Sequence, residues 1–514
     1  MKKMLVYNDD GWSSLMRYPA PATVEEIARR TVGLVLGTGV DIYQMCLLTG
    51  NVSIYESKIL ERYGDHLGKP YRMHMWRTIE NIRSLKEQGT DLLRIVIDKC
   101  HQSGIEAHAS LRINDKHHTY KMTPESSGLP SRFCRSEYVF PDLRSGWVEE
   151  RPQLCLPDSS LDFLYEESRQ LRIDTIREIL DNYDVDGIDL DFTRFPPFFQ
   201  EGHKEENSNL ITDMVQKVRR LVNDKSMLTG KKIKLTARVE FDTAANKEEG
   251  LDVENWIRNG LIDILYLGVI ADCTPDAPID SFIIMCEGTG CKVCPSIEGQ
   301  FHWVGGMNRT GPVRVSSLEM VRAFAANAYE AGADGIQLFN FCCADGKWDR
   351  NILTEIPFPD RFRFKDKLYY FTMSPARLFS LTCRWDSRLL LRDGENEARY
   401  SFIVSDHLAE GEKWNQCPSA TLMMRIMGLN KRDDISLYLN DTALFPEKTT
   451  ENLWDWDSWS DILHFCCPID AINTGENALK IIRSRDYQEY IGEIEVIEME
   501  LCIHYPQNNT IGSI

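Results

Sequence analysis

Short apolar runs alternate with amphipathic stretches through the first 360 residues of the chain. Eight runs have the length and composition of strands, and they span 3–8, 40–47, 105–112, 185–192, 232–241, 262–270, 291–299 and 333–341. Such alternation is typical of βα units that build a parallel sheet. Because no glycine-rich dinucleotide loop follows the first run, we predict a closed (β/α)8 TIM barrel, an α/β fold, rather than an open doubly wound sheet.

Two of the intervening segments carry clear helix signals. Thr23 can cap a helix whose first turn holds Glu25 and Glu26. Residues 161–180 place apolar side chains at a broadly helical period. We therefore predict one helix directly after Thr23 and another over 161–180.

The pattern changes after Pro357-Phe358-Pro359 to alternating strands and turns. The stretch 473–480 (NTGENALK) resembles the turn and strand of jelly-roll sugar-binding accessory domains. We predict two domains, a catalytic barrel over 1–360 and a smaller C-terminal β-sandwich, jelly-roll-like, over 361–514. A packing role is our default for the sandwich, and carbohydrate binding is the alternative.

Charge and hydropathy exclude several kinds of partner. The formal net charge of -19 over 514 residues leaves no obvious basic face for nucleic acid or an anionic membrane. An acidic substrate would therefore have to be bound by local arginines. No apolar run reaches the roughly 18 residues of a membrane span, and no signal peptide is visible in MKKMLVYNDDGW. A cytoplasmic location is the expectation, although a removed signal peptide would leave the same sequence.

The 15 cysteines form no recognisable disulfide framework or zinc motif. They are odd in number and spread along the chain, and they include the doublets 342–343 and 466–467. Cys291 and Cys294 form C-x-x-C inside a strand-like run, without a second pair. We interpret the cysteines as mostly reduced core residues, and we expect neither a metal nor a cofactor.

Polar clusters follow several of the predicted strands, where a barrel keeps its active site. Arg112 and Arg194 end neighbouring strands, so their guanidinium groups can form a fork for a carboxylate or phosphate. Asn340 can donate a further hydrogen bond from the last strand. Asn114 and Asp191 are additional candidates for substrate contacts. For Arg194 the alternative is a structural salt bridge to Asp191 or to Asp189. The long insertion 112–159 follows the third strand and is a candidate wall or lid.

Groups that can move protons lie at the same strand ends. Asp9 or Asp10 offers a general base, and His117 offers a general acid whose ordinary pKa lies near working pH. Inverting glycosidases keep such a pair roughly 6.5–9.5 Å apart. Adjacent strand residues face opposite ways, so only one of the two aspartates should reach the reacting water, and the sequence does not decide which. Asp115 and His118 are candidates for orienting His117, and the alternative is that they are solvated loop residues.

Together these residues resemble the active-site set of the inverting exo-sialidases of glycoside hydrolase family 156. The resemblance rests on the strand-one aspartate, the stretch R-I-N-D-x-H from Arg112 to His117, the arginine in D-F-T-R-F, and Asn340. It implies hydrolysis of terminal α-linked sialic acid from a sialylated glycan, without a cofactor. It also implies an aspartate base, His117 as acid, and a clamp of Arg112, Arg194 and Asn340 on the substrate carboxylate. A homodimer is implied only by this resemblance.

Other readings remain open. A barrel glycoside hydrolase for a neutral or uronic sugar could use Asp189, Asp191 or Glu240. A metal-dependent polysaccharide deacetylase would explain Asp9-Asp10-Gly11, but its two histidine ligands should lie at about i and i+4, and His117 is followed directly by His118. A non-catalytic sugar-binding protein could use the same scaffold.

Overall fold

The structure is a computed structural model. It describes residues 1–67, 69–70, 72–119, 143–270, 273–302, 313–344, 347–372, 389–392, 394–413, 417–429, 434–455, 458–484 and 493–506.

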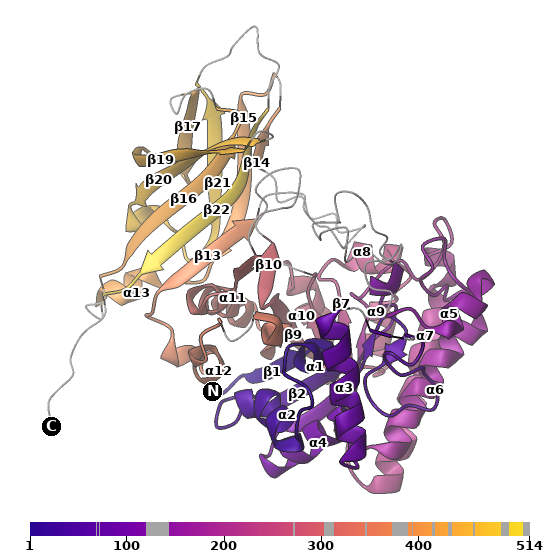
Figure 1. The fold of residues 1–514 in the computed structure, drawn as a ribbon. Coiled ribbons are helices and arrows are strands. Elements are labelled where there is room, and N and C mark those ends of the chain that lie inside the picture. The colour runs from indigo at the N-terminus through magenta and orange to yellow at the C-terminus, as the bar shows by residue number, and fades with distance from the viewer. Residues whose placement is uncertain are drawn as a thin grey trace, which may run out of the picture.

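Eight parallel strands close into a barrel in the order β1-β12-β9-β8-β7-β6-β5-β2. The barrel lies at the lower right of Figure 1, below the C-terminal strands. Their bounds are β1 (Met4–Asp9), β2 (Ile42–Cys46), β5 (Glu106–Arg112), β6 (Gly187–Asp191), β7 (Lys234–Val239), β8 (Ile264–Leu267), β9 (Lys292–Glu298) and β12 (Gly335–Phe339). All but a few of their residues are buried, because the inner face fills the barrel and the outer face packs against helices. The closed barrel and all eight of its predicted strands are confirmed.

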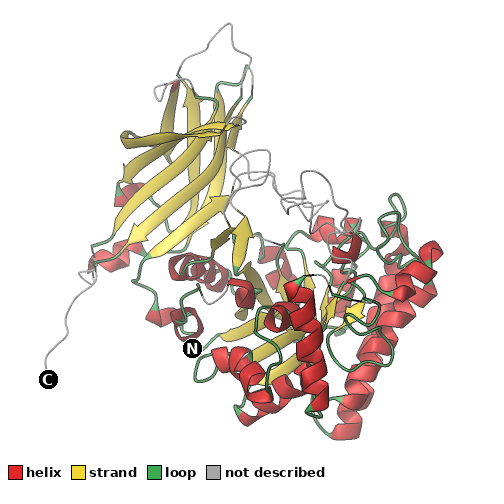
Figure 2. Cartoon of the chain, viewed as in Figure 1, coloured by secondary structure: helices red, strands yellow, loops and turns green. Residues whose placement is uncertain are grey.

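Helices cover the outside of the barrel (Figure 2). Their bounds are α1 (Trp12–Met16), α2 (Val24–Arg30), α3 (Met73–Glu87), α4 (Leu92–Gln102), α5 (Gly146–Glu150), α6 (Glu166–Asn182), α7 (Ser208–Thr229), α8 (Thr243–Glu248), α9 (Val253–Arg258), α10 (Asp280–Cys286), α11 (Leu318–Glu330) and α12 (Asn351–Glu355). Short 3-10 turns, among them η2 (His117–Thr119) and η7 (Phe341–Ala344), follow β5 and β12. No helix in the described residues is long and apolar enough to cross a membrane.

The two helix predictions have different outcomes. Thr23 caps α2 as predicted: its hydroxyl accepts from the Glu26 amide (3.2 Å), and the Glu26 carboxylate accepts from the Thr23 amide (3.0 Å). The helix predicted over 161–180 begins only at Glu166. Leu161 instead forms an isolated β-bridge with Cys155, and its amide donates to the Asn114 side chain (3.0 Å). Leu161 and Phe163 are thus buried outside the helix, whereas Leu164 is exposed.

The C-terminal part is a sandwich of two antiparallel sheets around one core. The first sheet contains β13 (Lys367–Thr372), β14 (Leu389–Leu391), β16 (Ser419–Met427), β19 (Pro446–Asp455), β20 (Ser458–Cys467) and β22 (Ile494–His504). The second contains β15 (Glu397–Val404), β17 (Ile435–Leu439), β18 (Thr442–Leu444) and β21 (Gly475–Arg483). This confirms the predicted β-sandwich, and 473–480 is indeed a turn followed by a strand.

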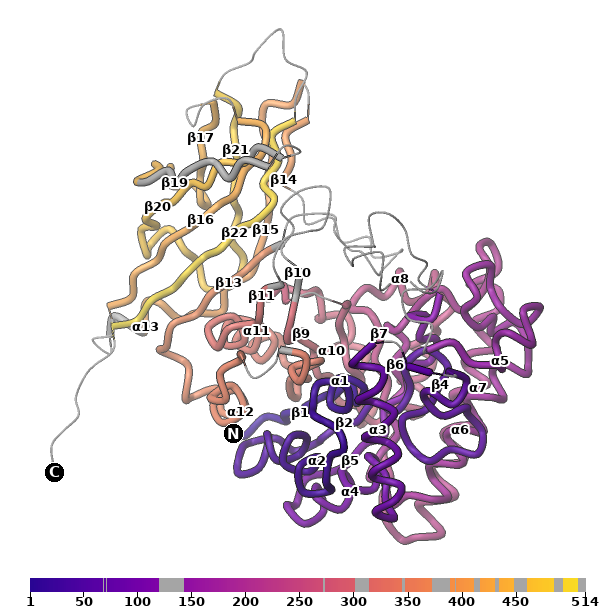
Figure 3. The backbone as a smooth tube through the Cα atoms, in the orientation of Figure 1, coloured from indigo at the N-terminus to yellow at the C-terminus, as the bar shows by residue number. Residues whose placement is uncertain are grey.

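The sandwich meets the barrel at α11 (Figure 3). The side-chain amide of Asn327 on this helix donates to the Ile403 carbonyl (2.9 Å) and accepts from the Ser405 amide (3.0 Å). One side chain from the barrel thus hydrogen-bonds the backbone at the end of β15. The division that we placed between residues 360 and 361 falls in the short 3-10 helix η8 (Pro359–Arg361), between the last barrel helix and β13.

Candidate active site at the carboxyl end of the barrel

The register of three neighbouring strands fixes a row of charged side chains at the mouth. Arg112 on β5 pairs with Asp191 on β6, which pairs with Arg238 on β7. Neighbours in a parallel register face the same side of a sheet, so the three side chains lie together. The Arg238 guanidinium is 3.6 Å from the Asp191 carboxylate and lies 3.7 Å from the centre of the Phe339 ring. One layer deeper, Asp189 accepts hydrogen bonds from Ser110 (2.7 Å) and Thr236 (2.8 Å).

Asp115 joins the predicted acid to an arginine. One of its oxygens accepts from the His117 Nδ1 (2.7 Å) and from the His117 amide (3.0 Å), and the other accepts from Arg112 (3.2 Å). Burial alone would raise the pKa of Asp115, but the His117 ring and the Arg112 guanidinium hold that pKa well below its usual range. An ionised Asp115 can only accept, so Nδ1 carries a hydrogen and Nε2 is the atom that can exchange a proton. Asp115 therefore orients His117, as one of our alternatives had it.

His118 has a different environment. It is fully buried, and its Nε2 donates to the Ser159 carbonyl (3.0 Å). Burial lowers its pKa. Within the part of the chain that the structure describes, His117 has a carboxylate partner that fits a proton-transfer role, while His118 anchors the insertion.

The two strand-one aspartates face opposite ways. Asn8 shares a side-chain contact with Gln44 (3.5 Å), so the even positions of β1 face the barrel interior. Asp9 faces outward and is completely buried, and its carboxylate accepts from Tyr43 (2.6 Å), from the Ser14 hydroxyl and from the Gly11 amide (both 2.9 Å). Burial raises the pKa of Asp9.

Asp10 lies at the mouth, where Ser13 donates to it from its amide (2.9 Å) and its hydroxyl (2.8 Å). It is within electrostatic reach of Arg112. Burial alone would lower the pKa of Arg112, but the surrounding acidic groups raise it, and these are Cys46, Asp115, Asp10 and Asp191. Geometry thus favours Asp10 over Asp9 as a group that can meet a substrate.

A second cluster is centred on Glu298 at the end of β9, a residue that the sequence analysis missed. The Asn340 amide donates to it (3.4 Å), and the guanidinium groups of Arg194 (4.0 Å) and Arg238 (3.8 Å) lie beside it. The acidic neighbour of Arg194 is therefore Glu298 rather than Asp189 or Asp191. The signal in the sequence that could have identified Glu298 is its position at the end of the strand-like run 291–299.

Four buried polar atoms at this mouth have no hydrogen-bond partner in the part of the chain that the structure describes. They are the Nε atoms of Arg112 and Arg194, Oδ2 of Asp191 and Oδ1 of Asn340. Buried polar groups are ordinarily satisfied, so these four atoms are candidates for contact with a ligand. Asn114 differs: it is fully buried and uses both ends of its amide on the backbone of residues 161 and 197. Its geometry disfavours the substrate contact that we assigned to it.

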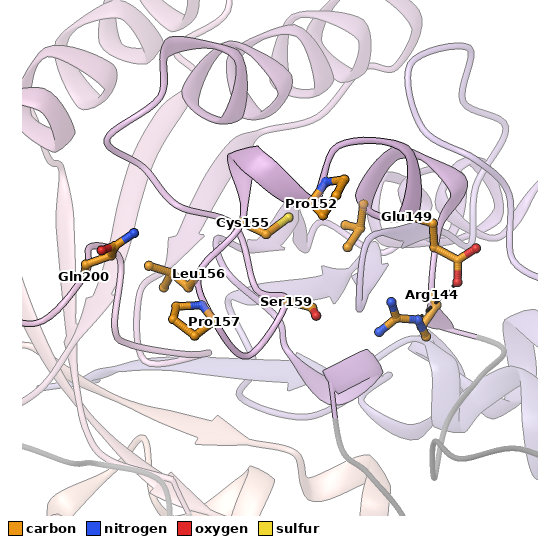
Figure 4. A pocket seen from close by; sticks show the side chains of 9 residues that line it. Arg144, Glu149, Pro152, Cys155, Leu156, Pro157, Ser159 and Gln200 are labelled. Atoms are coloured by element: carbon orange, nitrogen blue, oxygen red, sulfur yellow. Dashed lines mark hydrogen bonds and ion pairs between the residues drawn. The ribbon is translucent and has the colours of Figure 1, made fainter.

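The insertion forms a cavity of its own beside the His117 turn (Figure 4). The cavity has a volume of about 440 Å³, and Arg144 and Glu149 lie at one end of it with Gln200 at the other. The Arg144 side chain also donates to the His118 carbonyl (3.3 Å). Residues 143–159 of the predicted wall are thus tied to the mouth, and residues 120–142 lie outside the described residues.

Cysteines show both expected and unexpected placements. Cys291 and Cys294 are buried around β9, which confirms their packing role, and no disulfide joins the described cysteines. The doublet Cys342 and Cys343 is different, since both lie half-buried beside Asp10 rather than in the core. Among the described residues, these three form the one group whose side chains could jointly hold a metal ion. The histidine pair that a deacetylase requires is absent from it.

Comparisons with known proteins assign this chain to no family. No family model matches the chain, and no curated protein matches it. Among solved structures it is similar to chitinase ChiA74 from Bacillus thuringiensis, at 10% identity and a TM-score of 0.40, over 94% of this chain and 98% of the other. It is also similar to chitinase ChiW from a Paenibacillus species, at 10% identity and a TM-score of 0.39, over 68% of this chain and only 33% of that one.

A third similar structure is α-L-fucosidase isoenzyme 2 from Paenibacillus thiaminolyticus, at 13% identity and a TM-score of 0.37, over 70% of this chain and 49% of that one. All three are named for enzymes that act on sugars. At these identities and scores the similarities carry no argument about substrate or mechanism. The argument for function therefore depends on the site itself.

Proposed function

We propose that this chain is a glycoside hydrolase that removes a terminal α-linked sialic acid with inversion, with Asp10 as general base and His117 as general acid. One observation carries the proposal. Arg112, an anion-binding group, hydrogen-bonds the same carboxylate that orients His117, and it lies within electrostatic reach of Asp10. The group that would bind an anionic substrate therefore lies beside the groups that would transfer protons.

The charges suit a sugar that carries a carboxylate at the reacting carbon, as sialic acid does. Arg112 and Arg194 each keep Nε available, and Asn340 contributes a polar group from the opposite wall. Guanidinium groups recognise carboxylates through paired hydrogen bonds. The clamp would also offset the repulsion between the substrate carboxylate and Asp10. Asp191, with one unsatisfied oxygen, is suited to accept a hydroxyl of the sugar.

Proton transfer follows from the orientation of the two acid–base groups. With its Nδ1 hydrogen bonded to Asp115, His117 can donate from Nε2 to the leaving oxygen as the glycosidic bond breaks. Asp10, positioned by Ser13, accepts a proton from the water that attacks the anomeric carbon from the opposite face.

A panel of aryl glycosides tests the substrate class. We expect turnover of an aryl α-sialoside that a chelator does not abolish, and little or no turnover of neutral aryl glycosides. Turnover of neutral or uronic glycosides alone would favour a different barrel hydrolase. Loss of activity on chelation would return the metal-dependent alternative, and binding without turnover between pH 4 and 8 would indicate a sugar-binding protein. A variant His203→Ala, changed at an exposed histidine that pairs with Glu206, controls for handling.

A further inference from the structure

Two thiols and a carboxylate meet at the barrel mouth, in a group that the proposed hydrolysis does not use as a group. Asp10 ends β1, and Cys342 and Cys343 lie in η7 directly after β12, the strand next to β1. The Cys343 thiol is 3.3 Å from Oδ2 of Asp10 and 3.8 Å from the Cys342 thiol. The Cys342 thiol is 3.9 Å from Oδ1 of Asp10 and accepts from the Asp10 amide (3.4 Å).

The three ligand atoms lie within 4.8 Å of one another, and two of the separations can be compared with a tetrahedral zinc site. With Zn–S bonds of about 2.3 Å and a Zn–O bond of about 2.0 Å, tetrahedral angles put two sulfurs about 3.8 Å apart and a sulfur and an oxygen about 3.5 Å apart. The observed 3.8 Å and 3.3 Å are close to both values. Thiolates select zinc over the harder cations, because calcium and magnesium prefer oxygen ligands.

The ligand atoms are held in place by their surroundings. Arg17 donates to the carbonyls of Cys342 (3.3 Å) and Cys343 (2.7 Å), and the Gln300 amide also donates to the Cys343 carbonyl. Ser13 fixes the Asp10 carboxylate from its amide and its hydroxyl. Hydrogen bonds of this kind orient metal ligands and reduce the reorganisation that binding requires.

A buried phenol gives an independent sign of a ligand here. Tyr7 is fully buried, and its hydroxyl has no hydrogen-bond partner in the described part of the chain. It lies within electrostatic reach of both thiols of the doublet. A buried hydroxyl without a partner is uncommon in a native structure, so this one is consistent with a ligand near the doublet.

The second cysteine doublet shows that adjacency alone does not make such a site. Cys466 and Cys467 end β20, where successive side chains point to opposite faces, and one is exposed while the other is buried. They cannot hold one ion together. The doublet at 342–343 can, because the 3-10 turn brings both sulfurs to the same side.

We propose that Asp10, Cys342 and Cys343 bind a zinc ion, with the fourth coordination position open to water or to a ligand. As the metal–sulfur bonds form, each thiol releases its proton to solvent. Zinc bound here would occupy the carboxylate that the proposed function assigns as base. Occupation of the site should therefore inhibit hydrolysis, a consequence that rests on the proposed function, whereas the binding itself does not.

Zinc per chain, measured by equilibrium dialysis and elemental analysis without substrate, tests the site. The double variant C342S/C343S should bind one zinc fewer than the wild type. The control C417S/C466S, changed at two exposed cysteines, should bind as many as the wild type. Any other pattern overturns the proposal. Asp10→Asn should weaken binding by at least the roughly 10–100-fold that loss of an outer-sphere partner costs, and unchanged affinity would remove the carboxylate from the site.

Alkylation of the wild type keeps the test decisive if the double variant does not fold. Zinc should protect Cys342 and Cys343 from N-ethylmaleimide, as mapped by mass spectrometry of peptides, and should leave the labelling of Cys417 and Cys466 unchanged. Equal labelling with and without zinc would contradict the site. None of these measurements uses sialoside turnover, so a failed zinc site leaves the hydrolase proposal standing, and a failed hydrolase leaves the zinc site standing.

Discussion

Buried charges lie in both parts of the molecule, but their partners differ. In the sandwich, Asp406 accepts from Lys367 (2.8 Å) and Tyr505 (2.9 Å) on one oxygen and from Tyr369 (2.7 Å) on the other. At the barrel mouth, Asp191 and Arg112 are buried to the same degree, yet each keeps a polar atom with no partner in the described residues.

The difference separates a structural use of charge from a functional one. A buried charge that is completely hydrogen-bonded locks its neighbours together, and removing one member leaves the others unpaired. A buried charge that is incompletely bonded costs stability in the free protein and is repaid only when a ligand completes it. The same residue types thus hold the sandwich together and prepare the mouth for a substrate.

The largest effect should come from the proposed acid. His117→Ala should lower kcat/KM on sialyllactose by about 10²–10⁴-fold and should cost much less on an aryl sialoside with a good leaving group, because that group needs less protonation. Steady-state kinetics on both substrates checks this. Equal losses of kcat/KM on the two substrates would exclude His117 as the acid.

In the sandwich, Asp406→Asn should act on stability alone. It leaves the Lys367 ammonium buried without a counter-charge, so the free energy of unfolding should fall by about 3–5 kcal/mol. At a temperature where the variant is folded, kcat/KM should equal that of the wild type. Denaturant titration and steady-state kinetics on the same variant test both expectations. Unchanged stability, or a loss of activity in the folded variant, would contradict a purely structural role for Asp406.

Asp189, one layer below the mouth, should make stability depend on pH. Burial, with Asp191 nearby, raises its pKa from 3.8 to about 6. Because the folded pKa is the higher one, its contribution is full below about pH 4 and is lost as pH rises to about 6, by up to about 3 kcal/mol. Asp189→Asn should remove this part of the decline. Unfolding measured at pH 4 and pH 7 tests it, and an unchanged decline would refute the assignment.

The smallest stability effect is expected at Asp191. Asp191→Asn removes a charge whose Oδ2 has no partner in the described residues, and Arg238 keeps Glu298 as a second counter-charge, so the free energy of unfolding should fall by less than in Asp406→Asn. Activity should nevertheless fall strongly. Calorimetry beside kinetics compares this variant directly with Asp406→Asn. A loss of stability as large as in the sandwich would mean that both regions use charge in the same way.

Sequence patterns predicted the fold well because a parallel barrel repeats one signal eight times. The end of a segment was harder: the helix predicted from 161 begins at Glu166, since loop residues packed on Asn114 are as apolar as a helix face. Positions at or just after strand ends made Arg112, His117 and Asp10 candidates for the site. They could not identify Glu298 or Arg238 as neighbours of Arg194, because contacts between strands far apart in sequence depend on barrel closure.

Proton NMR of an incubation with sialyllactose tests the central claim most directly. The account predicts that free sialic acid appears first as the β-anomer, because water attacks from the face opposite the leaving group. Only later should it equilibrate to a mixture of the α- and β-anomers. The His203→Ala control should behave alike. Release of the α-anomer first, or no release by folded protein, would contradict an inverting sialidase at this barrel mouth.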